Sequence, residues 1–434
     1  MERESSYAAD LLHSKAHAAL SPVDHSLTTE LVMGVLRWRS LLDLQIAKAS
    51  SQPLARLDLE ILTALRLAVY QFRWLSRIPA RAAINESVEL VKRARKRSAA
   101  SFVNAVLRKL AASAHAVPPA IDGASVEALA ASAAHPEWLV ERWVQAYGLE
   151  AAIQICGHNQ SVPVSALRLR HPEAEDELRA EGLELAPGAF LASARRVVRG
   201  DVTGSSAYRS GRCVIQDEAS QLVAALLGHG SSILDCCAAP GGKTLAIADR
   251  NTNSTITAVD LHPHRARLLR RLMRAPDSSG DSGENIRIVA ADARDLPFTD
   301  CFDRVLADVP CSGTGTLSRN PEIKWRLKAD DLADLQARQL AILRSAMDRV
   351  TAGGRIVYST CSLEREENED VVEAALAGGA PFRVIECGKE LAALKEQGKF
   401  IWDNPNTLTR GPYLRTLPGV HPCDGFFAAI LERK

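Results

Sequence analysis

One stretch, residues 233–244 with the sequence ILDCCAAPGGKT, constrains the fold of this chain more than any other. Its apolar start ends at Asp235 and predicts a short buried strand, followed by a tight turn through Gly242 and a helix that opens with Lys243. Adjacent glycines have no Cβ atoms, so the backbone can turn sharply and a ligand can approach closely. The unpaired N–H groups at a helix start carry partial positive charge. The stretch is therefore either a plain strand–helix connection or a nucleotide-sized cradle at a sheet end.

The size and composition of the chain limit the other possibilities. Its 434 residues predict two or three domains, and 47% hydrophobic with 24% charged residues is ordinary for a globular protein. A net charge of +1 means that nucleic-acid binding must rest on local basic patches. No apolar run resembles a signal peptide or a membrane span, and the nine cysteines form no paired metal-binding pattern. We expect a cytoplasmic protein with free thiols, no membrane association and no metal.

The first hundred or so residues predict an all-helical bundle. Apolar residues recur at three- and four-residue steps from Ala8 to about Ala112, with breaks expected at Pro22, Pro53 and Pro79. Two basic runs, residues 37–39 and 92–97, interrupt this pattern. The second run, with five cations in six residues, is either a solvated helix face or a site of contact with phosphates.

The middle of the chain predicts a linker and then a small α/β domain. Residues 112–134 are rich in Ala, Ser and Pro, and residues 164–170 and 194–199 show strand-like alternation around a helix at 176–181. Five arginines rim these strands and indicate either an RNA-binding edge or a structural spacer. They are Arg168, Arg170, Arg195, Arg196 and Arg199.

Beyond residue 226 strands alternate with helices, which predicts a mostly parallel, doubly wound sheet. Strands are expected at residues 255–259, 286–290, 302–307 and 355–358, with helices at 263–273 and 332–350; residues 275–283 are expected to form a surface loop. Aspartates follow several strand ends, where the ligand crevice of such a sheet lies. They are Asp235, Asp260, Asp292 and Asp308.

Motif spacing narrows the ligand. Asp260 follows Gly242 by one strand–helix–strand unit, where a carboxylate can accept hydrogen bonds from the two hydroxyls of a ribose. The dinucleotide spacing GxGxxG is absent, and Ala238 stands where the phosphate-binding pattern GxxxxGK[ST] requires glycine. Ribose recognition without a pyrophosphate loop indicates S-adenosylmethionine as the methyl donor.

Two cysteines follow strand ends at the same predicted edge, Cys311 in VPCSGTG and Cys361 in YSTCS. Either could be a small core residue. A chemical role is also possible, because a thiolate that adds to carbon 6 of a pyrimidine makes carbon 5 nucleophilic enough to take a methyl group. The thiol must be accessible and the base flipped from its stack. Spacing alone does not tell which cysteine attacks.

Several motifs carry a family resemblance. Residues 27–43, 65–94 and 102–110 are similar to the RNA-binding NusB-like domain, and DCCAAPGGKT, AVDLHPHR, ADVPCSGTGTLSRNPEIKW and YSTCSLEREENEDVV resemble RNA 5-methylcytosine methyltransferases of the NOL1/NOP2/Sun family. The resemblance covers nearly the whole chain. It implies a multidomain fold: an all-α NusB-like helical bundle (1–128), a small α/β RNA-binding domain (129–226) and an α/β Rossmann-like class I methyltransferase domain (227–434).

The resemblance also implies roles for particular residues. Cys361 is the expected nucleophile, Cys311 assists release of the methylated product, and Asp308 lies beside the ring nitrogen of the target cytosine. The expected partner is 16S ribosomal RNA before full subunit assembly, bound by a monomer. The residues expected to bind S-adenosylmethionine are Cys237, Ala238, Ala239, Pro240, Gly241, Gly242, Lys243, Asp260, Asp292 and Asp308.

Three other readings remain at this point. The same chemistry could act on transfer RNA or another ribosomal site. A non-catalytic RNA-binding assembly factor could keep the fold, although a scaffold has no need for both thiols. A DNA methyltransferase would use a single Pro-Cys nucleophile, and the helical front end disfavours it.

Overall fold

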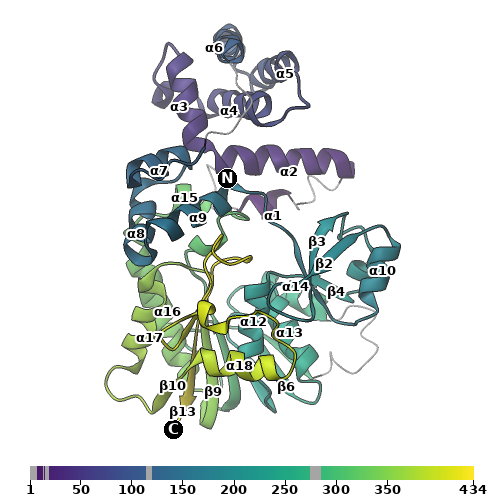
Figure 1. Cartoon of the computed structure of the whole chain (residues 1–434), viewed down its shortest axis with the longest axis vertical. Helices are drawn as coiled ribbons and strands as arrows, with labels where there is room; N and C mark the ends of the chain where they lie inside the picture. The colour runs from purple at the N-terminus through teal and green to yellow at the C-terminus, as the bar shows by residue number, and fades with distance from the viewer. Residues whose placement is uncertain (1–6, 13, 15–18, 114–119, 274–284) are drawn as a thin grey trace. The chain divides into compact units, whose positions relative to one another are not determined.

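The computed structural model describes residues 7–12, 14, 19–113, 120–273 and 285–434 (Figure 1). Two compact units emerge. The helical unit comprises Met1–Val162 and Leu317–Arg326, and the sheet unit comprises Pro163–Thr316 and Leu327–Lys434. The domain boundaries at 128 and 226 stay a prediction, and the loop expected at 275–283 lies outside the described residues. No helix in the described ranges is long and apolar enough to cross a membrane.

The helical unit follows the breaks that its prolines predict. α2 begins at Pro22, where the Ser21 hydroxyl accepts the Asp24 N–H at 3.2 Å, and α5 begins directly after Pro79. The predicted linker at 112–134 contains a further short helix, α7, whose N-cap Ser125 accepts from Ala128 N–H. The helices of this unit are α1 (Ala8–Leu12), α2 (Pro22–Arg37), α3 (Arg39–Ala49), α4 (Leu59–Trp74), α5 (Ala80–Arg93), α6 (Ala100–Ala112), α7 (Val126–Ser132), α8 (Glu137–Tyr147), α9 (Leu149–Gln160) and α15 (Ile323–Arg326).

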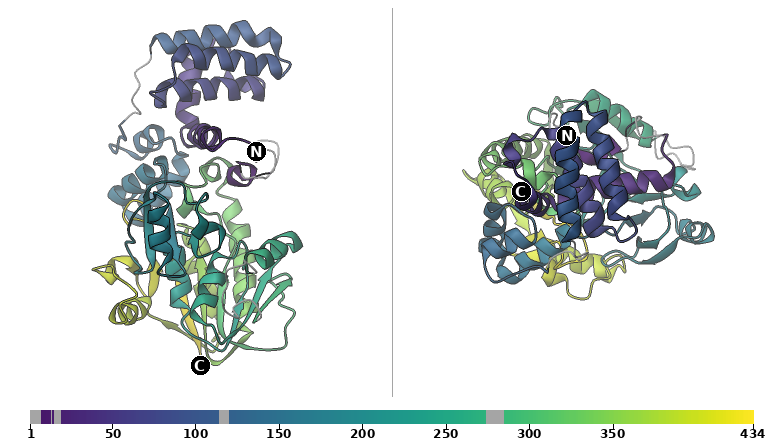
Figure 2. Two further views of the ribbon diagram at one scale, coloured as in Figure 1. Left: turned by 90° about the vertical axis from the view of Figure 1, so that its right-hand side faces the viewer. Right: turned by 90° about the horizontal axis from the view of Figure 1, so that it is seen from above.

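Part of the first basic run, residues 37–39, is buried in the helical unit. α4, α5 and α6 pack side by side (Figure 2), and Trp38 joins their core with its ring 5.3 Å from that of Trp74. Arg37 is also buried and donates to the Ser318 carbonyl at 2.9 Å. Arg37 and Trp38 of the first basic run are therefore buried and do not form an exposed basic surface. The run at 92–97 stays at the surface, where Lys96 pairs with Asp58 at 2.8 Å.

The sheet unit opens with the small antiparallel sheet that alternation predicts. Its strand order is β2-β3-β1-β4, and α10 (Ala174–Ala180) and α11 (Ser206–Arg209) accompany it. Leu167 and Leu178 lie fully buried in its core. The strands are β1 (Ala166–Leu169), β2 (Glu184–Pro187), β3 (Ala194–Arg199) and β4 (Cys213–Ile215).

The arginines of this sheet do not form one basic edge. Arg168 and Arg170 both pair with Asp249 of α13, at 2.5 and 2.7 Å, and their side chains are less than a tenth exposed. Arg195 pairs with Glu175 at 2.6 Å, whereas Arg199 is 81% exposed. Sequence alternation predicts which side chains lie on the same face of a strand. It does not predict which acidic residue from elsewhere in the chain packs against that face. The prediction of a five-arginine rim is wrong for Arg168 and Arg170, which join the small sheet to α13.

The large sheet has the doubly wound arrangement that strand–helix alternation predicts, with an antiparallel extension. β7, β6, β5, β8 and β9 are parallel, and β13 pairs antiparallel with β9 and β10. Its strands are β5 (Ser232–Asp235), β6 (Thr255–Asp260), β7 (Ile286–Ala290), β8 (Phe302–Asp308), β9 (Val350–Thr360), β10 (Phe382–Ile385), β11 (Thr409–Arg410), β12 (Tyr413–Arg415) and β13 (Phe427–Arg433).

Helices cover both faces of this sheet, α12, α13 and α18 on one and α16 and α17 on the other (Figure 1). Successive strand residues point to opposite faces, so Ala428 of β13 packs in one core and Phe427 in the other. The chain leaves β5 toward β6 on one side and returns to β8 on the other, which places a ligand crevice at their carboxyl ends. The helices are α12 (Glu218–Leu226), α13 (Gly242–Arg250), α14 (Pro263–Met273), α16 (Asp331–Met347), α17 (Glu369–Leu376) and α18 (Cys387–Glu396).

Candidate active site

The glycine turn lies at the carboxyl end of the central strand, β5. Backbone bonds tie it to both neighbours, since Cys236 N–H donates to Leu306 of β8 at 2.9 Å and Ala238 N–H to Val259 of β6 at 2.8 Å. Gly241 is the N-cap of α13 and has φ +113°. The turn is thus held at the switch point between β5 and β8, as the opening motif predicts.

Gly241 tests how much of this turn depends on glycine. We expect Gly241→Ala to lower the free energy of unfolding by about 1–3 kcal/mol, because a Cβ on this backbone is strained. That Cβ would also lie 2.6 Å from Leu269 Cδ1. Gly353→Ala is the matched control, since Gly353 has φ +70° but nothing within 4 Å of its Cβ position. Urea unfolding measures both, and equal losses would show that contact with Leu269 costs nothing.

Asp235 has a structural position rather than a ligand-facing one. It is 1% exposed, and its carboxylate accepts the Thr244 hydroxyl at 2.7 Å and the Cys237 N–H at 3.4 Å. Burial raises the pKa of Asp235 to about 7; the Thr244 hydrogen bond opposes this shift and the charge of Asp308 adds to it. Asp235 therefore links the end of β5 to the first turn of α13.

This raised pKa predicts a pH dependence of stability. The folded protein holds the Asp235 proton more tightly than the unfolded chain, so this contribution is complete below about pH 4 and is lost as the pH rises through about 7. In Asp235→Asn, which can still accept from Thr244, the fall in unfolding free energy between about pH 4 and pH 8 should be smaller by about 1–4 kcal/mol. Asp300→Asn, at an exposed position, is the control. Identical pH curves for Asp235→Asn and wild type would contradict the assignment.

Asp260 and Asp292 end neighbouring strands but differ in availability. Asp260 is buried at the end of β6, and its Oδ1 accepts the His262 N–H at 2.9 Å, while no described residue donates to Oδ2. Asp292 follows β7 and is held by Arg294, whose Nη2 lies 2.6 Å from Oδ2. The hydrogen bond from Arg294 lowers the pKa of Asp292. Asp260 thus keeps a carboxylate oxygen open to a ligand, whereas Asp292 is already engaged by its own neighbour.

Lys243 and Asp308 connect the glycine turn to the end of β8. Lys243 Nζ donates to Asp308 Oδ2 at 2.7 Å and lies 4.9 Å from the Phe426 ring centroid. Ser359 donates to the other Asp308 oxygen at 2.7 Å. Burial opposes the charge on Lys243, but the charge and hydrogen bond of Asp308, together with the nearby Cys361 and Asp235, raise the pKa of Lys243 overall. This chain of contacts holds Asp308 between the turn and the end of β9.

The two predicted cysteines meet. β8 and β9 are parallel neighbours, with Asp308 opposite Ser359, so the loops that follow begin side by side. Cys311 Sγ lies 3.3 Å from Cys361 Sγ, and both thiols are free and partly exposed. The hydrogen bond to Cys361, reinforced by burial, raises the pKa of Cys311 well above its usual range. Cys311 is therefore held as a thiol that can donate to the Cys361 sulfur.

We call residues 309–316 the first cysteine loop and residues 361–364 the second. Gly315 N–H donates to the Cys361 carbonyl at 2.9 Å, and Gly425 N–H donates to the Gly315 carbonyl at 2.8 Å. A Cβ on Gly315 would lie 2.2 Å from the Gly425 carbonyl oxygen, so only glycine permits this approach. The C-terminal segment before β13 thus closes against both cysteine loops.

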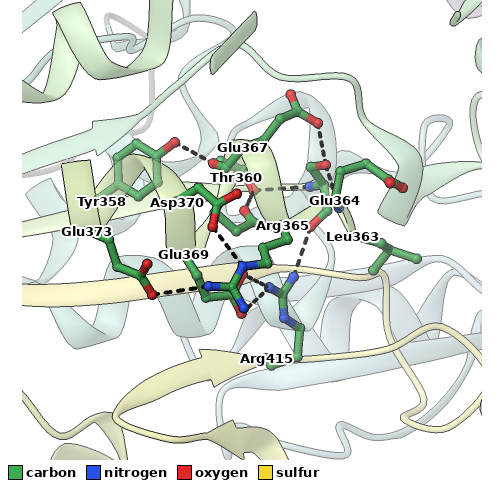
Figure 3. Close-up of polar contacts among 12 residues, drawn as sticks. Tyr358, Thr360, Leu363, Glu364, Arg365, Glu367, Glu369, Asp370, Glu373 and Arg415 are labelled. Carbon is green, nitrogen blue, oxygen red and sulfur yellow. Dashed lines mark hydrogen bonds and ion pairs between the residues drawn. The ribbon is translucent and has the colours of Figure 1, made fainter. Parts of the chain in front are cut away.

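Two site residues are missed by sequence reasoning, Glu367 and Arg415 (Figure 3). Glu367 is fully buried and contacts both cysteine loops. Arg415, 4% exposed, donates to the Ser362 carbonyl at 3.1 Å and pairs with Glu369 at 2.9 Å. The acidic run after YSTCS was a visible signal for Glu367, but Arg415 had none, since its partner lies 46 residues away. Within the described ranges, no cluster of three or more His, Cys, Asp or Glu could hold a metal.

Comparison with known proteins identifies the family. The family described as 16S rRNA methyltransferase RsmB/F matches residues 225–432, and the NusB family matches residues 1–112. The probable ribosomal RNA small subunit methyltransferase B of Bacillus subtilis is 36% identical over 446 residues, covering 100% of this chain and 96% of the relative. The chain belongs to the RsmB/F family of 16S rRNA methyltransferases. A further RsmB relative, the ribosomal RNA small subunit methyltransferase B of Pseudomonas syringae, is 33% identical and covers 94% of this chain and 89% of its own length.

Two solved structures have a similar fold. The crystal structure of PH0851 has a TM-score of 0.78 at 24% identity and covers 96% of this chain and 92% of its own. NSun6 from Pyrococcus horikoshii has a TM-score of 0.59 at 20% identity and covers 69% and 98%. The resemblance read from the motifs is confirmed, as are the NusB-like front and the Rossmann-like domain of this family member.

Proposed function

We propose that this chain transfers a methyl group from S-adenosylmethionine to carbon 5 of a cytosine in 16S ribosomal RNA, through a covalent bond between Cys361 and carbon 6. Membership of a family of small-subunit rRNA methyltransferases supports the substrate class. The observation that carries the chemistry is the pair of thiols, 3.3 Å apart at the carboxyl edge of the sheet. A non-catalytic scaffold gives no reason for that pair.

The polar groups at the crevice fit S-adenosylmethionine. Asp260 has a carboxylate oxygen without a donor among the described residues, which suits the hydroxyls of a ribose. The turn at 237–243 supplies backbone groups at a helix start, and Lys243 at its end pairs with Asp308 at 2.7 Å. Asp292 stays the least favoured of the predicted ligands because Arg294 already occupies it. When bound, this molecule supplies an electrophilic methyl group.

Cys361 begins the reaction. Its thiol loses a proton to solvent, and the sulfur adds to carbon 6 of the flipped cytosine while the electrons of the 5,6 double bond move into the ring. In this proposal Asp308 lies beside the ring nitrogen, and the ammonium of Lys243, 2.7 Å from Asp308 Oδ2, supplies the positive charge that offsets the negative charge developing there. Carbon 5 is then nucleophilic and takes the methyl group.

Cys311 completes it. Once the Cys361 sulfur is bonded to carbon 6, it no longer accepts the hydrogen bond that raises the pKa of Cys311. Cys311 then ionises more readily at the stage that needs a base. Removal of the proton on carbon 5 re-forms the 5,6 double bond and expels Cys361 as a thiolate. The enzyme acts as a cytoplasmic monomer on 16S RNA before full subunit assembly in this proposal.

The test is transfer of labelled methyl to naked 16S RNA, followed by bisulfite sequencing of the product. We expect label at a single protected cytosine, and the same cytosine should lose protection in ribosomal RNA from a deletion strain. Label on transfer RNA but not on 16S RNA would contradict 16S RNA as the substrate and favour transfer RNA. Label that leaves every cytosine bisulfite-sensitive would contradict methylation at carbon 5.

A further inference from the structure

One buried carboxylate joins the two cysteine loops. Glu367 is fully buried, and its Oε1 accepts the Ser312 N–H at 2.7 Å from the first loop. Its Oε2 accepts the hydroxyls of Ser312 and of Ser362, which belongs to the second loop. Each of these serines directly follows one of the paired thiols, Cys311 or Cys361. The same side chain therefore hydrogen-bonds to both loops, in each case at the residue that follows the cysteine.

A third element completes the grip. Gln339 of α16 donates to Glu367 Oε1 at 2.8 Å and to the Pro310 carbonyl at 3.0 Å. Pro310 is the residue before Cys311, so the first loop is held on both sides of its thiol. Four donors thus converge on one side chain, and an ionised carboxylate is the side chain whose two oxygens can accept from all of them. Such bonds offset the cost of burying the charge.

The position of Glu367 is itself set by the backbone. It ends the short helix η5 (Arg365–Glu367), and its N–H donates to the Glu364 carbonyl at 3.2 Å. The buried hydroxyl of Tyr358, in β9, donates to the Glu367 carbonyl at 2.6 Å (Figure 3). β9 therefore fixes Glu367 as well as the start of the second loop. Because Tyr358 of β9 holds Glu367, the position of Glu367 relative to β9 can set where the two loops meet.

We infer that Glu367 is a positioning residue that sets the separation of the Cys311 and Cys361 thiols through Ser312 and Ser362. The inference rests on the proposed function for its catalytic consequence, but the thiol spacing is a property of the protein alone. The negative charge of Glu367 also contributes to the raised pKa of Cys311, after the hydrogen bond to Cys361 and burial. Removing that charge affects the pair without touching either sulfur.

The variant that tests this is Glu367→Gln, which keeps the size of the side chain. Its oxygen can still accept from Ser312 N–H and Gln339, but its NH₂ group must face the two serine hydroxyls that now donate. Those hydroxyls can turn to accept, so the fold is kept while the grip on the second loop weakens. Glu373→Gln is the matched control, an exposed glutamate on α17 that pairs only with Arg365 among the residues described. Ser362→Ala removes one donor from the second loop alone.

Two readouts separate positioning from folding. Diamide converts two thiols to a disulfide, taking their two protons and two electrons and becoming a hydrazine, and mass spectrometry locates the Cys311–Cys361 link. We expect Glu367→Gln to form this link at least about tenfold more slowly than wild type, and to lose about 10- to 100-fold in kcat with the KM for both substrates unchanged. Ser362→Ala should move both quantities in the same direction but less, and Glu373→Gln should move neither.

Each outcome decides one point. Wild-type rates of disulfide formation and turnover in Glu367→Gln would overturn the positioning role. If the affinity of Glu367→Gln for S-adenosylmethionine falls by the same factor as kcat, or if the variant unfolds at the assay temperature, Glu367 serves folding. Either result would also overturn the positioning role. If wild type forms the link but methylates no cytosine, the proposed function fails while the positioning of the thiols stands.

Discussion

Cys361→Ala is expected to abolish methyl transfer to 16S RNA. The variant has no sulfur to add to carbon 6, and carbon 5 of an unactivated cytosine is too weak a nucleophile, so kcat should fall by at least about 10⁴-fold. Cys361 is partly exposed and alanine is smaller, so the loops should keep their fold. S-adenosylmethionine binding, measured by calorimetry, should stay within about twofold of wild type because most of the residues proposed to bind it lie on the glycine turn and on β6.

The control for this change is Cys301→Ala, which removes an exposed thiol whose single hydrogen bond among the described residues is to the Asp348 carbonyl. It should methylate at the wild-type rate. Residual turnover of Cys361→Ala above one hundredth of wild type would show that another group attacks the base. Cys311, 3.3 Å away, would then be the first candidate.

Cys311→Ser is expected to stop the reaction later, with RNA bonded to the protein. Cys361 remains and can add to carbon 6, and the methyl group can be transferred, but the group proposed to assist release is missing. A covalent protein–RNA complex should therefore accumulate, stable in denaturing gels, while multiple turnover falls by about 10²–10⁴-fold. The complex should appear with labelled methyl donor and carry one label per protein.

The double variant Cys311→Ser, Cys361→Ala is the decisive control, since it should form no covalent complex at all. The absence of a covalent complex in the double variant would show that the bond to RNA in Cys311→Ser is made by Cys361. If Cys311→Ser instead releases methylated RNA at the wild-type rate, the role of Cys311 in release is wrong, and its thiol serves only as a hydrogen-bond donor to Cys361.

Local sequence patterns predicted most of the elements. The helix expected at residues 263–273 is α14, and the strand at 286–290 is β7, because apolar periodicity and strand-end aspartates depend only on neighbours along the chain. Alternation could not predict that β13 pairs antiparallel with β9, since strand direction depends on where the chain returns. Nor could it predict that Arg168 is buried against Asp249, 81 residues away.

The site divides in the same way. Residues 233–244 by themselves predicted a strand, a tight turn and a helix start that were either a plain connection or a ligand cradle, since the backbone freedom of glycine and the charge at a helix start are local properties. The aspartates after later strands then favoured the cradle. Two cysteines at strand ends were visible, and the family resemblance identified their chemistry. Only the tertiary structure decided that β8 and β9 are neighbours in register, which brings Cys311 and Cys361 within 3.3 Å. It also decided that Glu367 holds both loops, because a buried carboxylate finds its donors in space and not along the chain.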